Sequence, residues 1–197
     1  MRAESAVMAK GKIPRNAALV IIDLQKGITG MPVEPYDAST VISNAAKLAR
    51  KFRESSMLVV PVHVSGPKEI MLHPEIDDQG QQFSRMERPP DWDEFVEELE
   101  VSPGDLIVTK HQWGAFYGTG LDMQLRRRKI DTLVMCGIAT TYGVESTARF
   151  AYEYGYNQIF VRDAMSDRSK NAHEASIEFV LSRIGKIRNT DEVISML

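Results

Sequence analysis

The chain alternates short apolar runs with amphipathic segments, and this alternation constrains the fold more than any other feature. The run AALVII at 17–22 is apolar throughout, as is typical of a strand buried on both faces of a parallel sheet. The segment 40–55 instead repeats apolar residues at helical spacing. Further strands are predicted at 57–64, 105–110, 132–136, 158–164 and 186–190, and further helices at 120–129, 173–185 and near the C-terminus. This order predicts a three-layer α/β/α fold with a mostly parallel sheet of about six strands.

Length, charge and cysteine content restrict the class of protein. A chain of 197 residues has the size of one domain, so we expect 1–197 to form a single domain with a flexible N-terminal tail at 1–15. The net charge of −3 gives no electrostatic reason to expect nucleic acid or a membrane surface as a partner. No apolar run approaches the ~18 residues of a membrane span, and the N-terminus lacks the apolar segment of a signal peptide. Because the lone Cys136 has no partner for an internal disulfide, we expect a cytoplasmic protein.

Three candidate functional features follow predicted strands. In parallel sheets of this kind, ligands bind outside the carboxyl ends of the strands. Asp23, Lys110 and the turn at 137–143 stand at such ends. Each also has a structural explanation: Asp23 would bond loop amides, Lys110 would project into solvent, and Gly137 and Gly143 would serve a turn and helix packing. Their positions indicate a site, but spacing alone identifies no chemistry.

The segment 65–104 shows little periodicity. A loop of this length in a compact domain is usually functional or mobile. It contains Arg85 and Arg88, which carry the charge needed to meet an anionic substrate. Both are therefore candidates for substrate binding.

Several motifs together resemble the isochorismatase-like hydrolases, also called cysteine hydrolases. ALVIIDLQKG at 18–27 is similar to the family's apolar strand followed by Asp-x-Gln. The segment 108–156 resembles its lysine segment, its phenylalanine-glycine-threonine segment and its strand-turn-helix. VRDAMSDRS, HEASI and NTDEV, within 161–191, also resemble the family. The resemblance extends from about Ala18 to the C-terminus, and the combination is more specific than any single motif.

The resemblance implies a catalytic site with an unusual composition. Asp23, Lys110 and Gly143 take the three positions of the family's catalytic triad. Most members have a cysteine where this chain has Gly143, so the usual nucleophile is missing. The family also has a cis peptide in this turn, which here joins Ile138 to Ala139.

The resemblance carries further expectations about ligands and assembly. Members are usually oligomers, so we expect a homodimer or larger. The nicotinamidases of the family bind zinc through an Asp-x-His pair; here Pro61 stands two residues before His63, so we expect no metal, and we expect no cofactor. Related isochorismatases have a substrate-binding tyrosine where Ala139 stands, which implies a pocket of different shape. The residues expected to contact a small-molecule substrate are Gln25, Arg85, Arg88, Trp113, Phe116, Ala139 and Tyr142.

The expected chemistry depends on the turn around Gly143. A helix that begins near Tyr142 has unpaired amides at its start, which suit a carboxylate or a developing oxyanion. We expect Thr140 or Thr141 to cap this helix, and Gly143 to leave room for water or a bulkier substrate. Family members with glycine here cleave a vinyl ether without a covalent intermediate, with the aspartate as acid. By analogy Asp23 is a general acid, provided that burial raises its pKa more than the nearby ammonium lowers it.

Three functions are compatible with these residues. The first is hydrolysis of a small, carboxylated substrate, such as a vinyl ether, through acid catalysis by Asp23 oriented by Lys110. The second is a catalytically inactive binding or scaffold protein. The third is an amide hydrolase that uses Cys136 or a water molecule, and a nucleophilic Cys136 must be exposed and have a low pKa. Cys136 stands at the end of an apolar strand, and this position instead predicts a small core residue.

Overall fold

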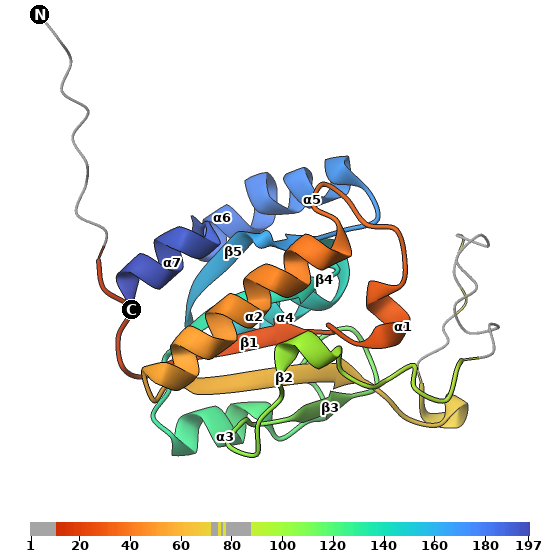
Figure 1. Ribbon diagram of the computed structural model, residues 1–197, viewed down its shortest axis with the longest axis horizontal. Helices are drawn as coiled ribbons and strands as arrows, with labels where there is room; N and C mark the ends of the chain where they lie inside the picture. Colours follow the sequence, from red (N-terminus) through yellow and green to blue (C-terminus); the bar gives the residue numbers. More distant parts are fainter. Residues whose placement is uncertain (1–10, 72–74, 76, 78–87) are drawn as a thin grey trace, which may run out of the picture.

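The centre of the fold is a parallel sheet of six strands. The structure, a computed structural model, describes residues 11–71, 75, 77 and 88–197. The strands lie in the order β3-β2-β1-β4-β5-β6 (Figure 1). They are β1 (Ala17–Ile22), β2 (Leu58–Val64), β3 (Val108–Lys110), β4 (Thr132–Ile138), β5 (Asn157–Ser166) and β6 (Lys186–Arg188). The predicted parallel sheet and its strand number are confirmed, although β3 begins at Val108 rather than at residue 105.

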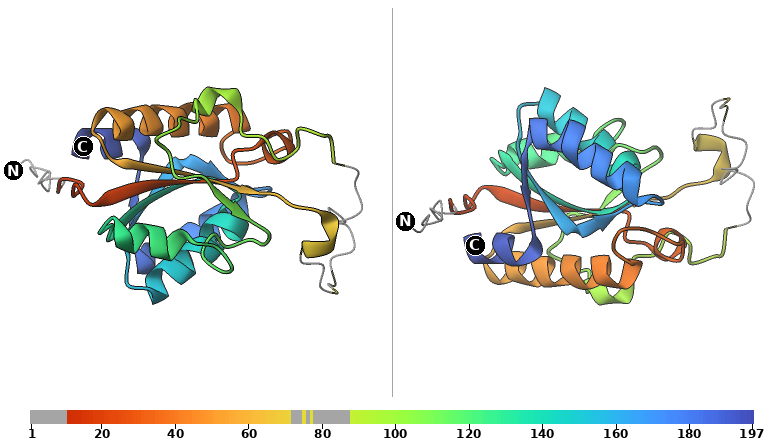
Figure 2. Two further views of the ribbon diagram at one scale, coloured as in Figure 1. Left: turned by 90° about the horizontal axis from the view of Figure 1, so that it is seen from below. Right: turned by 90° about the horizontal axis from the view of Figure 1, so that it is seen from above.

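Helices cover both faces of this sheet and give the predicted three layers (Figure 2). One face carries α1 (Lys26–Thr29), α2 (Ala38–Glu54) and α7 (Thr190–Met196); the other carries α3 (Leu121–Arg127), α4 (Glu145–Glu153), α5 (Lys170–Ser176) and α6 (Ser182–Ile184). Short turns are η1 (Lys68–Ile70), η3 (Glu97–Leu99), and the π-helical η4 (Thr140–Val144) and η5 (Ile177–Leu181). Because helices cover both faces, every residue of β1 and β4 is buried.

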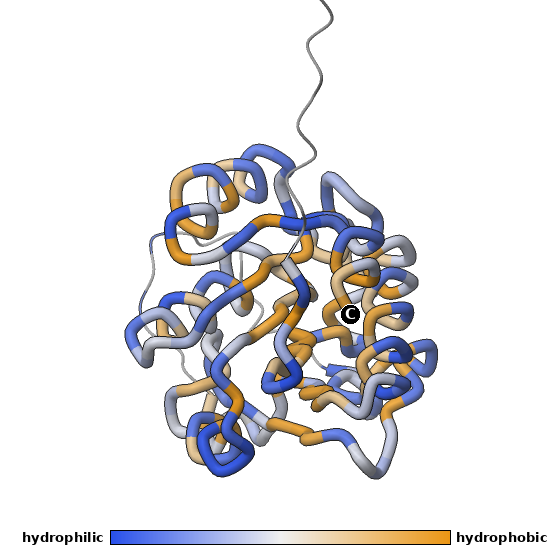
Figure 3. Tube along the Cα trace, turned by 90° about the vertical axis from the view of Figure 1, so that its left-hand side faces the viewer, coloured by the Kyte–Doolittle hydropathy of each residue, from blue (hydrophilic) through white to orange (hydrophobic). Residues whose placement is uncertain are grey.

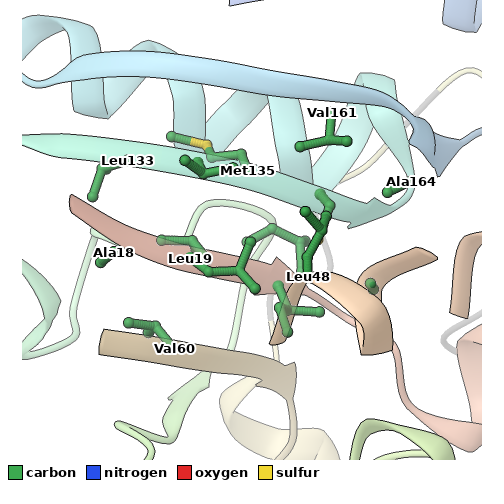
Figure 4. Packing of buried hydrophobic residues seen from close by; sticks show 14 of the residues in the cluster. Ala18, Leu19, Leu48, Val60, Leu133, Met135, Val161 and Ala164 are labelled. Carbon is green, nitrogen blue, oxygen red and sulfur yellow. The ribbon is translucent and has the colours of Figure 1, made fainter. Parts of the chain in front are cut away.

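The 17-residue helix α2 follows from its sequence pattern. The Asp37 carboxylate caps its first turn by accepting a hydrogen bond from the Thr40 amide at 2.7 Å. Its apolar positions face the sheet, where Leu48 lies close to Leu19 of β1 (Figure 4). Full burial of a side chain such as Leu48 contributes about 1.5–3 kcal/mol. Figure 3 shows apolar stretches along the central strands, whereas the outer helices alternate between apolar and hydrophilic residues.

The ends of the described chain are close together. Residues 1–10, most of the predicted tail, lie outside the described residues. Ile13 is buried, and its amide donates to the Met196 carbonyl at 2.9 Å. The predicted tail at 1–15 is therefore too long, because Ile13 already packs in the domain. None of the helices in the described ranges has both the length and the apolarity to cross a membrane.

The strand order also makes the chain diverge at one edge of the sheet. From β1 the chain adds β2 and β3 on one side, and from β4 it adds β5 and β6 on the other. The connections that leave β1 and β4 therefore diverge at their carboxyl ends. In open parallel sheets, such a divergence forms the crevice in which ligands bind.

Candidate active site

Asp23, Lys110 and Gly143 meet at this divergence. Asp23 follows β1, Lys110 ends β3, and Gly143 lies in η4, directly after β4. Lys110 Nζ lies 2.8 Å from Asp23 Oδ2. A Cβ atom placed on Gly143 would lie 3.0 Å from Asp23 Oδ2 and 3.1 Å from Lys110 Nζ. Three residues predicted from separate strand ends thus form one cluster.

The backbone turns sharply at Asp23. Its φ is 52°, in the left-handed region that residues other than glycine rarely adopt. The Asp23 amide donates to the Val62 carbonyl at 2.9 Å, so the chain stays attached to β2 while it leaves β1. Such conformations cost about 1–3 kcal/mol and concentrate at functional sites. The alternative role for Asp23 was a carboxylate that bonds loop amides. In the described part of the chain, the Asp23 carboxylate instead accepts its hydrogen bond from Lys110.

Burial controls the charge of Asp23. The residue is 6% exposed, and its Oδ1 is buried with no hydrogen-bond partner among the described residues. Burial raises the pKa of Asp23, and this effect outweighs the opposing effects of the Lys110 ammonium and, to a smaller extent, of His63. The carboxyl group is therefore shifted towards its protonated form, which is the direction that a general acid requires.

Lys110 is enclosed rather than exposed. Only 1% of its side chain is accessible, so the alternative of a lysine that projects into solvent is wrong. β2 lies between β3 and β1, and Lys110, which pairs with Val64 at the end of β2, reaches across β2 to Asp23. Its ammonium also donates to the Trp113 carbonyl. A buried ammonium needs such partners, because an unpaired charge in the interior is costly.

Gly143 does not leave the space that we expected. A Cβ atom at this position would lie 2.7 Å from Ile22 Cγ2, in addition to its close approach to Asp23 and Lys110. Side chains already fill the volume that a larger residue would occupy. The glycine instead allows the Asp23–Lys110 pair to lie directly against the backbone of η4.

The amides at the start of η4 are bonded within the chain. The Tyr142 and Val144 amides both donate to the Ala139 carbonyl at 3.2 Å. The Thr141 amide donates to the Asp167 carboxylate at 2.6 Å. The expectation of unpaired amides is therefore wrong for these three, and Asp167, rather than Thr140 or Thr141, accepts from the helix start. The Ile138–Ala139 peptide is cis, as the resemblance implies.

The predicted substrate contacts have different surroundings. Trp113 and Tyr142 pack edge to face with ring centroids 4.9 Å apart, and Trp113 is 60% exposed beside Lys110. Phe116 is buried against Tyr154 and Tyr156, which follow the carboxyl end of α4, whereas Gly143 precedes its amino end. Phe116 is thus packed away from the cluster. Ala139 is partly exposed and closes the π-helical turn through its carbonyl.

Gln25 supports the loop around the site. It is fully buried, and its Nε2 donates to the Val64 and Trp92 carbonyls at 3.1 and 3.2 Å. Its oxygen accepts from the Val64 amide at 2.9 Å. Because both Nε2 protons are used, Gln25 connects the ends of β1 and β2 to the later loop.

One of the two predicted arginines lies on that anchored loop. The Arg88 guanidinium carbon lies 4.2 Å from the centroid of the Trp92 ring, in a cation–π contact. The Trp92 indole covers Gly27, where an added Cβ would lie 2.0 Å from the ring. Arg88 is therefore held next to the segment that follows Asp23, while Arg85 lies outside the described residues.

Sequence reasoning gave no role to two buried polar residues near the turn. Asp167 is 2% exposed and bonds Thr141, and His173 is fully buried and bonds Thr140. Both lie in stretches that resemble the family, but a resemblance does not identify their partners. Asp167 could have been singled out in the sequence, because it is a polar residue that directly follows an apolar strand. His173 gave no such signal, because its contact arises only when α5 packs on η4.

Cys136 is a core residue. It is fully buried, and burial, with a smaller effect of the Asp163 charge, raises the pKa of its thiol. This contradicts the exposed, low-pKa thiol that a nucleophilic Cys136 requires.

We expect Cys136→Ser to leave any turnover within a few-fold and to lower the free energy of unfolding by about 1–3 kcal/mol, because it buries a hydroxyl. Denaturant titration and kcat measure the two effects. Loss of activity in a folded variant, together with inhibition of the wild type by a thiol reagent, would contradict this expectation.

The described residues contain no group of three or more His, Cys, Asp or Glu side chains suited to a metal ion. His63 uses both ring nitrogens within the protein. Its Nδ1 lies 2.8 Å from the Asp93 carbonyl, and its Nε2 lies 2.8 Å from Thr109 Oγ1. Its surroundings are those of a residue that supports the loop.

The parallel sheet between two helical layers, with an acid and a buried lysine at its carboxyl edge, is the three-layer α/β/α fold of a family of hydrolases. The chain belongs to the isochorismatase family: the isochorismatase domain matches residues 17–192. The uncharacterized isochorismatase family protein YwoC of Bacillus subtilis is 51% identical over 185 residues, covering 93% of this chain and 95% of that protein. The structure of an isochorismatase family protein from Burkholderia thailandensis superposes with a TM-score of 0.87 at 38% identity, covering 96% of this chain and 99% of the other.

More distant relatives are named for different functions. The phenazine biosynthesis protein PhzD1 of Pseudomonas aeruginosa is 29% identical over 184 residues, covering 92% of this chain and 86% of that protein. The N-carbamoylsarcosine amidase structure from Thermoplasma acidophilum has a TM-score of 0.72 at 28% identity, covering 89% and 96% of the two chains. The family is one of hydrolases, and the names of its members differ in function.

Proposed function

We propose that the protein hydrolyses a small, carboxylated substrate such as an enol ether, with Asp23 as general acid and no covalent intermediate. The observation that carries the proposal is the buried Oδ1 of Asp23, which has no partner among the described residues. A protonated carboxyl with one unbonded oxygen is able to donate its proton to a substrate. Gly143 offers no nucleophile, which favours direct attack by water.

The proposed reaction begins with proton transfer from Asp23 to the terminal carbon of the enol ether. The resulting oxocarbenium ion adds water at its cationic carbon, and the hemiketal then breaks its C–O bond to release an alcohol and a ketone. The water's proton restores Asp23. Lys110 orients the carboxyl and stabilises the carboxylate left after proton transfer, at 2.8 Å from Oδ2. We assign recognition of the substrate carboxylate to Arg88, with Arg85, and contact with its apolar part to Trp113 and Tyr142.

A substrate screen tests this proposal. Purified protein is incubated with isochorismate, with other carboxylated enol ethers and with small amides, and products are separated by chromatography. We expect turnover of an enol ether and none of the amides. Turnover of amides alone would contradict the proposal and would favour an amide hydrolase that activates water.

Replacing Lys110 by methionine is expected to move the alkaline limb of the pH–rate profile to higher pH. The ammonium lowers the pKa of Asp23, so its removal raises that pKa further. An acid acts while it is protonated; activity therefore falls as pH rises through the pKa of Asp23, and it falls later in the variant. Lower kcat is also expected, because Asp23 loses its orienting hydrogen bond.

The kcat of both proteins across pH measures this shift. Lys51→Met is the matched control, because Lys51 forms an exposed ion pair with Glu54 on α2. An alkaline limb that stays in place in Lys110→Met would show that Asp23 does not produce it.

A binding role without catalysis is the second candidate, and the burial of the site favours it. Asp23 is 6% exposed and Lys110 is 1% exposed, so the reacting groups are closed to solvent. Saturable binding of a small carboxylate in calorimetry, with no turnover of any compound in the screen, would support this second function.

We also propose that the protein is a cytoplasmic homo-oligomer. Trp113, Tyr117, Tyr152 and Tyr154 are 44–66% exposed, and a large contiguous patch of such side chains is typical of an interaction surface. We expect a dimer or larger in light scattering at micromolar concentration. A monomeric mass at that concentration would contradict the expectation.

A further inference from the structure

Thr141, in the turn that contains Gly143, is held by a carboxylate from the end of β5. Asp167 Oδ2 accepts from the Thr141 amide at 2.6 Å and from its hydroxyl at 2.7 Å. Asp167 Oδ1 accepts from the Arg168 amide at 2.7 Å. Both carboxylate oxygens of this buried residue are thus bonded, and the negative charge lies at the amino end of η4, where the helix dipole favours it.

Thr140 is held by an imidazole from α5. Its hydroxyl donates to the Ser166 carbonyl at 3.1 Å, and it lies 2.8 Å from His173 Nδ1. Because the hydroxyl has one proton and the carbonyl can only accept, Nδ1 must carry a hydrogen and donate to Thr140. Burial lowers the pKa of His173, which favours the neutral ring.

Packing alone does not explain this imidazole. His173 is fully buried, and its Nε2 has no hydrogen-bond partner among the described residues. An unpaired buried nitrogen costs free energy, so an apolar side chain of similar size would be at least as stable here. Two properties therefore distinguish histidine from leucine at this position: the bond from Nδ1 to Thr140, and an edge-to-face contact with the Tyr36 ring at 6.2 Å between centroids. His173→Asn separates them, because it keeps a donor and loses the ring.

We propose that Asp167 and His173 are positioning residues, which hold Thr141 and Thr140 so that Gly143 stays against the Asp23–Lys110 pair. The contact has little tolerance, because a Cβ on Gly143 would already lie 2.7 Å from Ile22 Cγ2. A displacement of η4 by about 1 Å would change the space around the unbonded oxygen of Asp23, and misplacement of that size lowers rates by up to roughly 10²-fold. This positioning role rests on the proposed function, because turnover is one of the quantities that measure it.

The test compares His173→Leu with His173→Asn, because the asparagine amide places a donor near the position of Nδ1. We expect His173→Leu to lower kcat by roughly 10- to 100-fold, with KM changed less and thermal stability unchanged or raised. His173→Asn should keep kcat within a few-fold of wild type. Thr140→Val and Thr140→Ser form a second pair, in which only the serine retains the hydroxyl.

Amide hydrogen exchange gives a readout that needs no substrate. We expect amide exchange at 141–144 of η4 to increase in His173→Leu and Thr140→Val, but not in the two conservative variants, while α4 stays protected. Unchanged exchange and unchanged kcat in His173→Leu would overturn the proposal. Equal loss of kcat in both His173 variants, with a matching loss of stability, would also overturn it by showing a general packing role. If Asp23→Asn is as active as wild type while the His173 pair still differs, acid catalysis fails and the positioning role stands.

Discussion

Replacing Asp23 by asparagine is expected to lower kcat by roughly 10²–10⁴-fold, the usual contribution of a positioned acid. Asparagine has nearly the same shape but has no acidic proton to transfer. Its amide oxygen can still accept from Lys110, which lies 2.8 Å from Oδ2, so the cluster should keep its geometry. Steady-state kinetics on the substrate found in the screen measures the effect, and circular dichroism checks the fold.

Asp105→Asn is the matched control for this experiment. Asp105 is also a buried carboxylate paired with a cation, since its side chain is 3% exposed and lies 2.7 Å from Arg53, but it precedes β3 and is far from the carboxyl ends of the strands. We expect this control to lose stability and to retain kcat. Equal kcat for Asp23→Asn and wild type would remove acid catalysis by Asp23.

Replacing Gly137 by alanine is expected to prevent folding. Gly137 has a φ of 122°, and a Cβ there would lie 2.0 Å from the Ile22 carbonyl oxygen and 2.6 Å from the Ile22 nitrogen. These are backbone atoms of the neighbouring strand β1, so no side-chain rotation relieves the clash. We expect a loss of more than about 4 kcal/mol, which is comparable to the total stability of many domains. Soluble yield and denaturant titration measure it.

Gly118→Ala separates the two causes of this loss of stability, backbone strain and steric clash. Gly118 also has a positive φ, 67°, but no atom lies within 4 Å of its added Cβ. This control carries the backbone strain without the clash, and we expect it to fold with a loss of about 1 kcal/mol. Similar stabilities of the two variants would show that the contact with Ile22 does not limit the position.

Local sequence patterns were enough to predict the architecture and the main candidate residues. Apolar runs such as 17–22, between helical repeats such as 40–55, are local patterns, so they predicted the parallel sheet and its two helical layers without knowledge of any contact. Because ligands bind at the carboxyl ends of parallel strands, the same patterns singled out Asp23 and Lys110.

The surroundings of these residues, in contrast, depend on contacts that form in the folded protein. The protonation of Asp23 depends on the balance between burial and the Lys110 ammonium, and the strand order that encloses both sets this balance. The crowding at Gly143 comes from Ile22, and the bonding of the Thr141 amide comes from Asp167, each on another segment. Local periodicity contains no information about such contacts, because they form only when segments distant in the chain pack together.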